Sequence, residues 1–316
     1  MHCRHAPGPR LHAAARMLCR LTCVIALLWA AHARAGEGGV LVLGRISDDP
    51  RVHYEQLRPL LDYVVPRMRE AGIVEGRILM ARDPQQMSAY LRRGRVDWVT
   101  ETAASAMLLE RGAGARPLLL TERNGTGRYH TVFFVHRDSD VRRLEDLRGR
   151  SIAFQTRAST SAFVVPAVEL LARGLRLELM VSPKDEPPPD AVGFVFGGSE
   201  SNISTWVHKR LVDAGAFSDL DWARPDAMPP SFRRDLRIVH ETPEYPRALE
   251  MVRADLDPRV RDRLRQVLLE AADDPEAAPA LRHFFGATRF VPLDAAEEGR
   301  LDYIRGAVQR VAGEVE

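Results

Sequence analysis

Short apolar segments alternate with amphipathic segments along most of this chain, and this alternation limits the fold more than any other feature. Residues 39–46 (GVLVLGRI), 77–81 and 96–100 have the length and apolar content of buried strands. Residues 54–65 place their apolar side chains on one helical face, and Asp83, which is followed by proline, has the form of a helix N-cap. The order strand, helix, strand, helix, strand predicts an α/β sheet.

A second alternating unit follows the first, and the last part of the chain is mainly helical. Two α/β units of about a hundred residues each, with a helical tail, predict one lobe, a second lobe and a return to the first. We expect lobe 1 to contain residues 36–131 and 240–316, and lobe 2 to contain residues 132–239. The chain should cross between the lobes near residues 131–134 and 236–241.

The first 35 residues differ in composition from the rest of the chain. Arginines precede an apolar run at residues 21–31, and Ala33-Arg34-Ala35 has the small-x-small form of a cleavage site. Residues 1–35 therefore predict a signal peptide that exports the protein to the periplasm. A retained membrane anchor is the alternative, but the apolar run is much shorter than the roughly twenty residues of a membrane-spanning helix. Translation could start at Met1 or at Met17.

Charge and cysteine usage exclude several classes of function. The chain has 45 Lys and Arg against 43 Asp and Glu. Five of the arginines and none of the acids lie in residues 1–35, so the mature chain would have 40 basic residues against 43 acidic ones. This balance gives no support for binding to nucleic acid. The three cysteines are Cys3, Cys19 and Cys23, so the mature chain has neither a disulfide nor a cysteine nucleophile.

Catalytic and metal-binding patterns are absent from the sequence. It contains no Gly-x-Ser-x-Gly, no His-Glu-x-x-His and no phosphate-binding Walker loop, and its histidines lack the spacing of metal ligands. We expect no enzymatic activity, no cofactor and no metal.

The polar turn Ser159-Thr160-Ser161 is the most informative local feature. It follows a predicted strand and begins a predicted helix at residues 160–173. The first turn of a helix has unpaired backbone amides and the positive end of the helix dipole, and hydroxyls there can donate to an anion. The alternative is a plain N-cap, which needs only one Ser or Thr.

The segment around this turn resembles the phosphate/phosphite/phosphonate substrate-binding protein family. That family typically has a DLKGK-like turn, then STSG and an apolar helix with proline. This chain has DLRGR at residues 146–150, STSA at 159–162 and Pro166. Further segments match the family in the same order, and they lie at residues 94–98, 196–199, 211–216 and 252–258.

The resemblance implies an α/β, two-lobed type II periplasmic binding protein fold with a ligand cleft between the lobes. It implies that Ser159, Thr160 and Ser161 hold a phosphonate or phosphate group. Tyr129, beside the predicted crossing segment, and Asp219, after a strand, are further candidate ligand contacts, although Tyr129 could pack the hinge and Asp219 could be a turn acid. We expect a monomer that works with the membrane permease of an ABC transporter.

Two positions depart from the family pattern. The family often has Gly-Pro-x-x-Tyr after its third strand, where this chain has Glu101 and Thr102, and it commonly has Gly-Ser-His where this chain has Glu200. A carboxylate about 4 Å from a phosphate would cost on the order of 4 kcal/mol at an effective dielectric constant of about 20. Either the glutamates point away from the ligand, or the ligand is a zwitterion such as an aminophosphonate.

Three functions remain compatible with the sequence. The first is the periplasmic solute-binding protein of an ABC importer, which captures a small anionic or zwitterionic ligand by lobe closure. The second is a periplasmic subunit that reports the ligand to a signalling partner. The third is a periplasmic hydrolase of phosphoesters or phosphonates. Turnover of such a substrate without added metal would support this third function.

Overall fold

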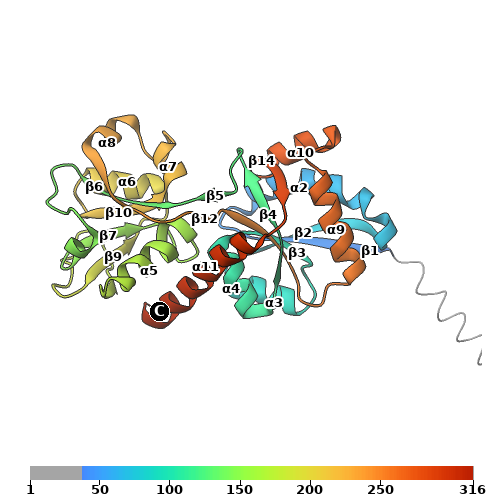
Figure 1. The fold of residues 1–316 in the computed structure, drawn as a ribbon, viewed down its shortest axis with the longest axis horizontal. Coiled ribbons are helices and arrows are strands. Elements are labelled where there is room, and N and C mark those ends of the chain that lie inside the picture. Colours follow the sequence, from blue (N-terminus) through green and yellow to red (C-terminus); the bar gives the residue numbers. More distant parts are fainter. Residues whose placement is uncertain (1–37, 316) are drawn as a thin grey trace, which may run out of the picture.

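Two lobes, each built around a six-stranded mixed sheet, make up the protein in a computed structural model that describes residues 38–315 (Figure 1). The expected signal peptide lies outside the described residues. The first sheet contains, in spatial order, β14 (Ala287–Val291), β4 (Arg116–Arg123), β13 (Ala248–Val252), β3 (Trp98–Thr102), β1 (Gly39–Ile46) and β2 (Ile73–Ala81). The two-lobed α/β architecture confirms the fold class expected from the sequence.

The second sheet lies in the other lobe and has its own mixed topology. It contains, in spatial order, β11 (Leu236–Glu241), β6 (Thr131–His136), β10 (Ala214–Ser218), β7 (Ser151–Phe154), β9 (Val192–Phe196) and β8 (Leu177–Leu179). Strands β10, β7, β9 and β8 run parallel to one another, and β6 is antiparallel to its two neighbours. Parallel neighbours place their carboxyl ends at one edge of the sheet.

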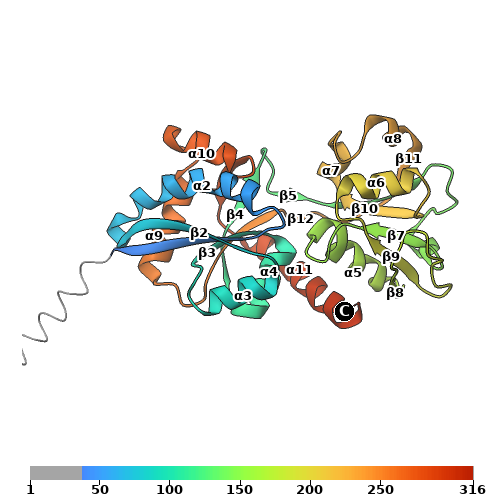
Figure 2. The ribbon, with the colours of Figure 1, turned by 180° about the vertical axis from the view of Figure 1, so that it is seen from behind.

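Helices cover both sheets, as the two opposite views show (Figures 1 and 2). The helices of the first lobe are α2 (Pro50–Arg67), α3 (Pro84–Arg92), α4 (Ala103–Ala113), α9 (Pro258–Glu270) and α10 (Ala278–His283). The second lobe contains the short π-helix η3 (Thr160–Val164), which continues into α5 (Val165–Ala172), and also α6 (Glu200–His208), α7 (Asp219–Ala223) and α8 (Pro230–Asp235). None of the helices within residues 38–315 is long and apolar enough to span a bilayer.

Local capping explains where several helices begin. The Asp83 side chain accepts a hydrogen bond from the Gln86 amide at 2.7 Å, and Pro84 occupies the first turn of α3, as the sequence predicts. Asp49 caps α2 in the same way, through the Val52 amide at 3.2 Å. Each aspartate satisfies one of the free amides at a helix N-terminus.

The crossing between lobes lies a few residues away from the expected segments. Strands β6 and β11 are paired with each other inside the second sheet. The segments between the lobes are instead β5 (Arg128–Tyr129) and β12 (Tyr245–Pro246), which pair as a separate two-stranded antiparallel ribbon (Figure 1). Residues 131–134 and 236–241 belong to the second sheet because their backbones pair there, and Val132, Phe134 and Ile238 pack in its core. The division of the chain at residues 131/132 and 239/240 stays a prediction.

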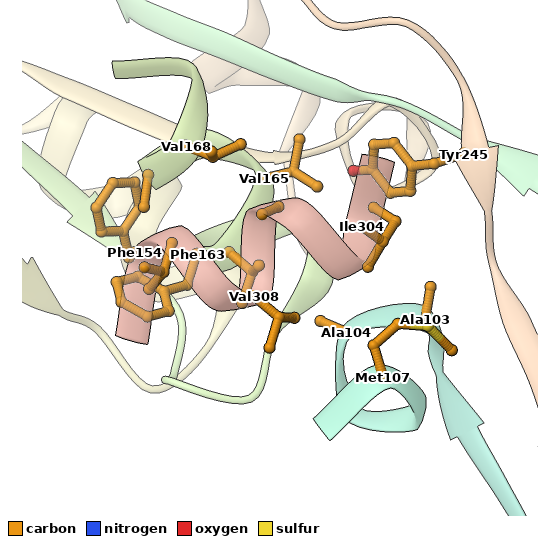
Figure 3. Packing of buried hydrophobic residues seen from close by; sticks show 14 of the residues in the cluster. Ala103, Ala104, Met107, Phe154, Phe163, Val165, Val168, Tyr245, Ile304 and Val308 are labelled. Carbon is orange, nitrogen blue, oxygen red and sulfur yellow. The ribbon is translucent and has the colours of Figure 1, made fainter. Parts of the chain in front are cut away.

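The C-terminal helix α11 (Ala295–Glu314) packs against both lobes. Figure 3 shows Ile304 and Val308 of α11 between Phe163 of the second lobe and Ala104 of the first. Polar contacts follow the same division, since Arg305 binds Glu110 of α4 at 2.7 Å, whereas Tyr303 donates to Glu169 of α5 at 2.8 Å. One apolar core cluster therefore continues from lobe to lobe through this helix.

A fully buried carboxylate, Glu250, lies in the middle of the first sheet. It accepts hydrogen bonds from Trp98 Nε1 at 2.6 Å, from Thr100 Oγ1 at 2.9 Å and from Thr121 Oγ1 at 2.5 Å. Burial raises the pKa of Glu250, while the three donors and the nearby Arg123 oppose that rise. Strand β13, which carries Glu250, is thereby joined to the strands on both of its sides.

Replacing Glu250 with alanine should therefore destabilise the first lobe. The change leaves buried donors on Trp98, Thr100 and Thr121 without their acceptor, so the free energy of unfolding should fall by about 3 kcal/mol. Urea denaturation of residues 36–316 measures this loss. Glu75→Ala is the control, because that carboxylate is exposed and pairs with the exposed Arg77, and it should hardly move the midpoint. Equal losses in both variants would contradict the structural role of Glu250.

Candidate functional site

Three serines cap helices along one edge of the second sheet. The Ser159 hydroxyl accepts a hydrogen bond from the Ala162 amide at 3.1 Å. Ser199 caps α6 and Ser218 caps α7 in the same way, by accepting from a backbone amide in the first turn at 3.2 Å and 3.1 Å. The three serines follow β7, β9 and β10, whose parallel order brings their carboxyl ends to the same edge. The Ser159-Thr160-Ser161 turn therefore lies among three helix N-termini, which carry free amides and positive dipole ends.

The turn faces the first lobe, where it contacts the start of α4. The amide of Ala104 donates to Thr160 Oγ1 at 2.9 Å, and Ser105 Oγ donates to the Ala158 carbonyl at 3.4 Å. Thr160 and Ser161 are only 1% and 7% exposed. The sequence-predicted turn thus sits where the lobes meet, and one of its hydroxyls already satisfies an amide of the opposite helix.

Thr102 occupies the N-cap of α4, but its side chain makes no capping hydrogen bond. The first amides of α4 therefore depend on groups other than their own cap residue. Among the described residues, Thr160 supplies the acceptor for one of them. An anion held between the lobes would meet helix N-termini from both sides, which is a favourable environment for negative charge.

Tyr129 completes a polar cluster beside the turn. Tyr129 is buried on the β5–β12 ribbon, and the centroid of its ring lies 4.9 Å from that of Tyr245. Burial raises the pKa of Tyr129 to about 12, while hydrogen bonds with Thr160 and Ser161 oppose this rise. Thr131 Oγ1 bonds to the Tyr245 hydroxyl at 2.6 Å and donates to the Ser161 carbonyl at 2.9 Å. The structure thus brings Tyr129, Thr160 and Ser161 together through one hydrogen-bonded network.

Glu101 has partners within its own lobe. Its carboxylate accepts from the Ile46 amide at 2.7 Å, lies 3.7 Å from Arg45 and is almost completely buried. Burial raises the pKa of Glu101, and the attraction to Arg45 opposes this rise. Its negative charge is therefore balanced by the protein itself, which the sequence pattern did not reveal.

Glu200 and Asp219 lie at the starts of α6 and α7, on the edge that carries the Ser-Thr-Ser turn. Burial, followed by the charge of Asp221, raises the pKa of Glu200. Asp219 accepts a hydrogen bond from the His130 amide at 3.0 Å, and its carboxylate lies 3.7 Å from His130 Nδ1. Asp219 is thus anchored to the residue next to Tyr129, whereas Glu200 has acidic neighbours that disfavour its ionised form.

Three arginines near these groups escaped the sequence analysis. Arg45 lies at the end of β1, Arg123 ends β4, and Arg247 follows the crossing strand β12. Burial and the charge of Arg45 lower the pKa of Arg123 to about 9. Burial lowers the pKa of Arg247, and the nearby carboxylate of Asp221 opposes this shift. An arginine at the end of an apolar strand, where ligands meet α/β sheets, is the signal that could have identified Arg45 and Arg123.

No cluster of three or more His, Cys, Asp and Glu side chains within residues 38–315 is arranged to hold a metal ion. The groups gathered between the lobes are hydroxyls, helix amides, arginines and carboxylates. They have the chemistry to bind an anion reversibly through hydrogen bonds and charge.

Comparison with known proteins agrees with this chemistry. Residues 45–297 match the family model described as ABC transporter, phosphonate, periplasmic substrate-binding protein. XAC2383 from Xanthomonas citri, solved bound to chloride ion, is 55% identical with a TM-score of 0.84, and the match covers 87% of this chain and 99% of that one. A structure of XAC2383 bound to ATP is 54% identical with the same TM-score, covering 88% and 99%.

A more distant structure shares only the fold. PhnD1 from Prochlorococcus marinus, in complex with methylphosphonate, is 18% identical with a TM-score of 0.62, and the match covers 86% of this chain and 98% of that one.

The family consists of substrate-binding proteins and not of enzymes, which confirms the expected lack of catalysis and sets the hydrolase alternative aside. This chain belongs to the family of periplasmic substrate-binding proteins of phosphonate ABC transporters.

Proposed function

We propose that this protein captures a small ligand with a phosphonate- or phosphate-like group between its lobes, and presents it to the permease of an ABC importer in the periplasm. The observation that carries the proposal is the position of the Ser159-Thr160-Ser161 turn, which is buried against the first turn of α4 from the other lobe. Residues 1–35 would direct export, and the chain would act as a monomer.

The proposed contacts follow from the chemistry of the turn. A phosphonate oxygen can replace Thr160 as the acceptor for the Ala104 amide. The freed hydroxyl of Thr160 and the hydroxyl of Ser161 can then donate to the same anion. Tyr129 supplies another donor, because a tyrosine hydroxyl is protonated at neutral pH and burial raises its pKa further, to about 12. Ligand binding would thus use groups from both lobes, and a closed arrangement would be favoured.

The similar protein XAC2383 from Xanthomonas citri has been solved bound to ATP and bound to chloride ion. Both bound groups are anions, which supports an anionic ligand for the present chain. The complex with ATP extends the proposed class from small phosphonates to larger ligands with phosphoryl groups. A role in sensing would use the same residues, and only the partner that reads the closed form would differ.

The first prediction concerns the anion contacts. Thr160→Ala combined with Ser161→Ala should weaken methylphosphonate binding at least about tenfold, since hydrogen bonds to a charged group are removed. Isothermal titration calorimetry measures this change. Ser231→Ala with Thr288→Ala is a matched control of the same composition at exposed positions, and it should bind like the unmodified protein. An unchanged affinity for methylphosphonate in the folded Thr160/Ser161 variant would exclude the turn as the anion-binding site.

The second prediction concerns lobe closure. The ribbon of β5 and β12 joins the lobes, so small backbone rotations there would bring them together around the ligand. Small-angle X-ray scattering should show a smaller radius of gyration with saturating methylphosphonate than without it. The Thr160/Ser161 double variant at the same ligand concentration should keep the larger radius. A tightly bound ligand that leaves the radius unchanged would rule out hinge closure.

The third prediction concerns a zwitterionic ligand. Because Glu101 is already paired with Arg45, Glu200 is the carboxylate that would face a ligand amine. We expect 2-aminoethylphosphonate to bind about tenfold more tightly than ethylphosphonate, and Glu200→Gln to remove most of this preference. Competition calorimetry measures both affinities, with Glu186→Gln in an exposed loop as the control. Equal affinities in the unmodified protein would restrict the ligand to a simple anion.

A further inference from the structure

Two arginines in the first lobe share one aromatic ring. The guanidinium carbon of Arg45 lies 4.7 Å from the centroid of Phe285, and that of Arg123 lies 4.6 Å from it. The aromatic ring attracts both cations and holds them near each other. Phe285 itself has a φ of +54°, a left-handed conformation that residues other than glycine rarely adopt. The backbone is thus held in an unfavourable conformation at the residue that positions the two guanidinium groups.

The pair lies on the edge of the first sheet that carries the start of α4. Arg45 donates from Nη1 to the Thr100 carbonyl at 2.8 Å, and Arg123 approaches the Thr100 side chain at 3.5 Å. Thr100 is two residues before Thr102, the N-cap of α4. Arg247 donates to the Arg123 carbonyl at 3.0 Å. It directly follows β12, which pairs with the strand that contains Tyr129, so the arginines continue toward the Ser-Thr-Ser turn.

The cations in this cluster are incompletely satisfied. Arg123 interacts with two buried carboxylates, Glu101 and Glu250, and Arg45 lies 3.7 Å from Glu101. Arg247 instead interacts with Asp219 and Asp221 of the second lobe. The Nε atoms of Arg45 and Arg123 are buried and have no hydrogen-bond partner among the described residues. Burial and repulsion from Arg45 also lower the pKa of Arg123 to about 9. Buried cationic donors without an acceptor are costly, and an anionic oxygen of a ligand would satisfy them.

We propose that Arg45 and Arg123 bind a second anionic group of the ligand, so that the protein prefers ligands with two linked phosphoryl groups over ligands with one. This inference rests on the proposed function, in which the Ser159-Thr160-Ser161 turn holds the first group. The second group lies on the first-lobe side, where Phe285 fixes both guanidinium groups. Glu101 keeps Arg45 in place and leaves its Nε atom available.

A purely structural role makes a different prediction. If the arginines serve only to neutralise Glu101 and Glu250, their removal lowers stability and affects ligands with one or two phosphoryl groups equally. If they bind the second group, their removal changes the ratio of the two affinities. The ratio is therefore the measurement that separates the two roles, because a general loss of folding cancels in it.

The test compares pyrophosphate with orthophosphate by calorimetry on residues 36–316. The unmodified protein should bind pyrophosphate at least about tenfold more tightly, and Arg123→Gln should reduce this ratio to near one, as expected for a lost charge-assisted contact. Arg45→Gln combined with Glu101→Gln should act in the same direction without leaving a buried carboxylate unpaired. The control is Arg77→Gln, which makes the same charge change on an exposed part of β2 and should keep the ratio.

The outcomes separate this inference from the proposed function. Tight orthophosphate binding without a preference for pyrophosphate would overturn the inference and leave the proposed function in place. A preference that survives in both folded arginine variants would also overturn it, because another group would then hold the second phosphoryl. If neither probe binds the unmodified protein, both the proposed function and this inference fail.

Discussion

The apolar face of α11 is the constraint on which the arrangement of the two lobes depends. Its buried side chains pack on α4 in one lobe and on η3 and α5 in the other, so a single core joins both halves (Figure 3). This helix packs against both α4 and η3, and between them the Ala104 amide lies within hydrogen-bond distance of Thr160. The bond from Ala104 to Thr160 is buried, and a hydrogen bond from which water is excluded is electrostatically stronger than one in water.

Charge is balanced differently in the two lobes. In the first lobe, Glu101 and Glu250 are buried beside arginines and hydrogen-bond donors. In the second lobe, Glu200 shares its surroundings with Asp221 and depends on Arg224 for compensation. The first lobe thus offers cationic groups and the second offers hydroxyls and helix amides, so a ligand with several anionic oxygens would find complementary partners on both sides.

The sequence alone was sufficient for the alternation of strands and helices, the cap at Asp83 and the family of the chain. It was also sufficient to single out the Ser-Thr-Ser turn, although not the bond from Ala104 to Thr160, because that contact joins residues from different lobes. The ribbon of β5 and β12 was missed because two-residue strands carry no periodicity. The pairing of Glu101 with Arg45 depends on neighbouring strands, and a linear pattern does not specify which strands are neighbours.

Strand β13 has a consequence for the order in which the molecule can assemble. It lies between β3 and β4 in the first sheet, yet in the sequence it comes after all the strands of the second sheet. The first sheet therefore cannot close until residues 248–252 are available, whereas the second sheet contains only one continuous stretch of chain. Contacts so distant in sequence form slowly, and a nascent polypeptide would still lack its central strand while the ribosome synthesised the second half. Strands β3 and β4 of the first lobe therefore lack their shared neighbour until more than three quarters of the chain has been made.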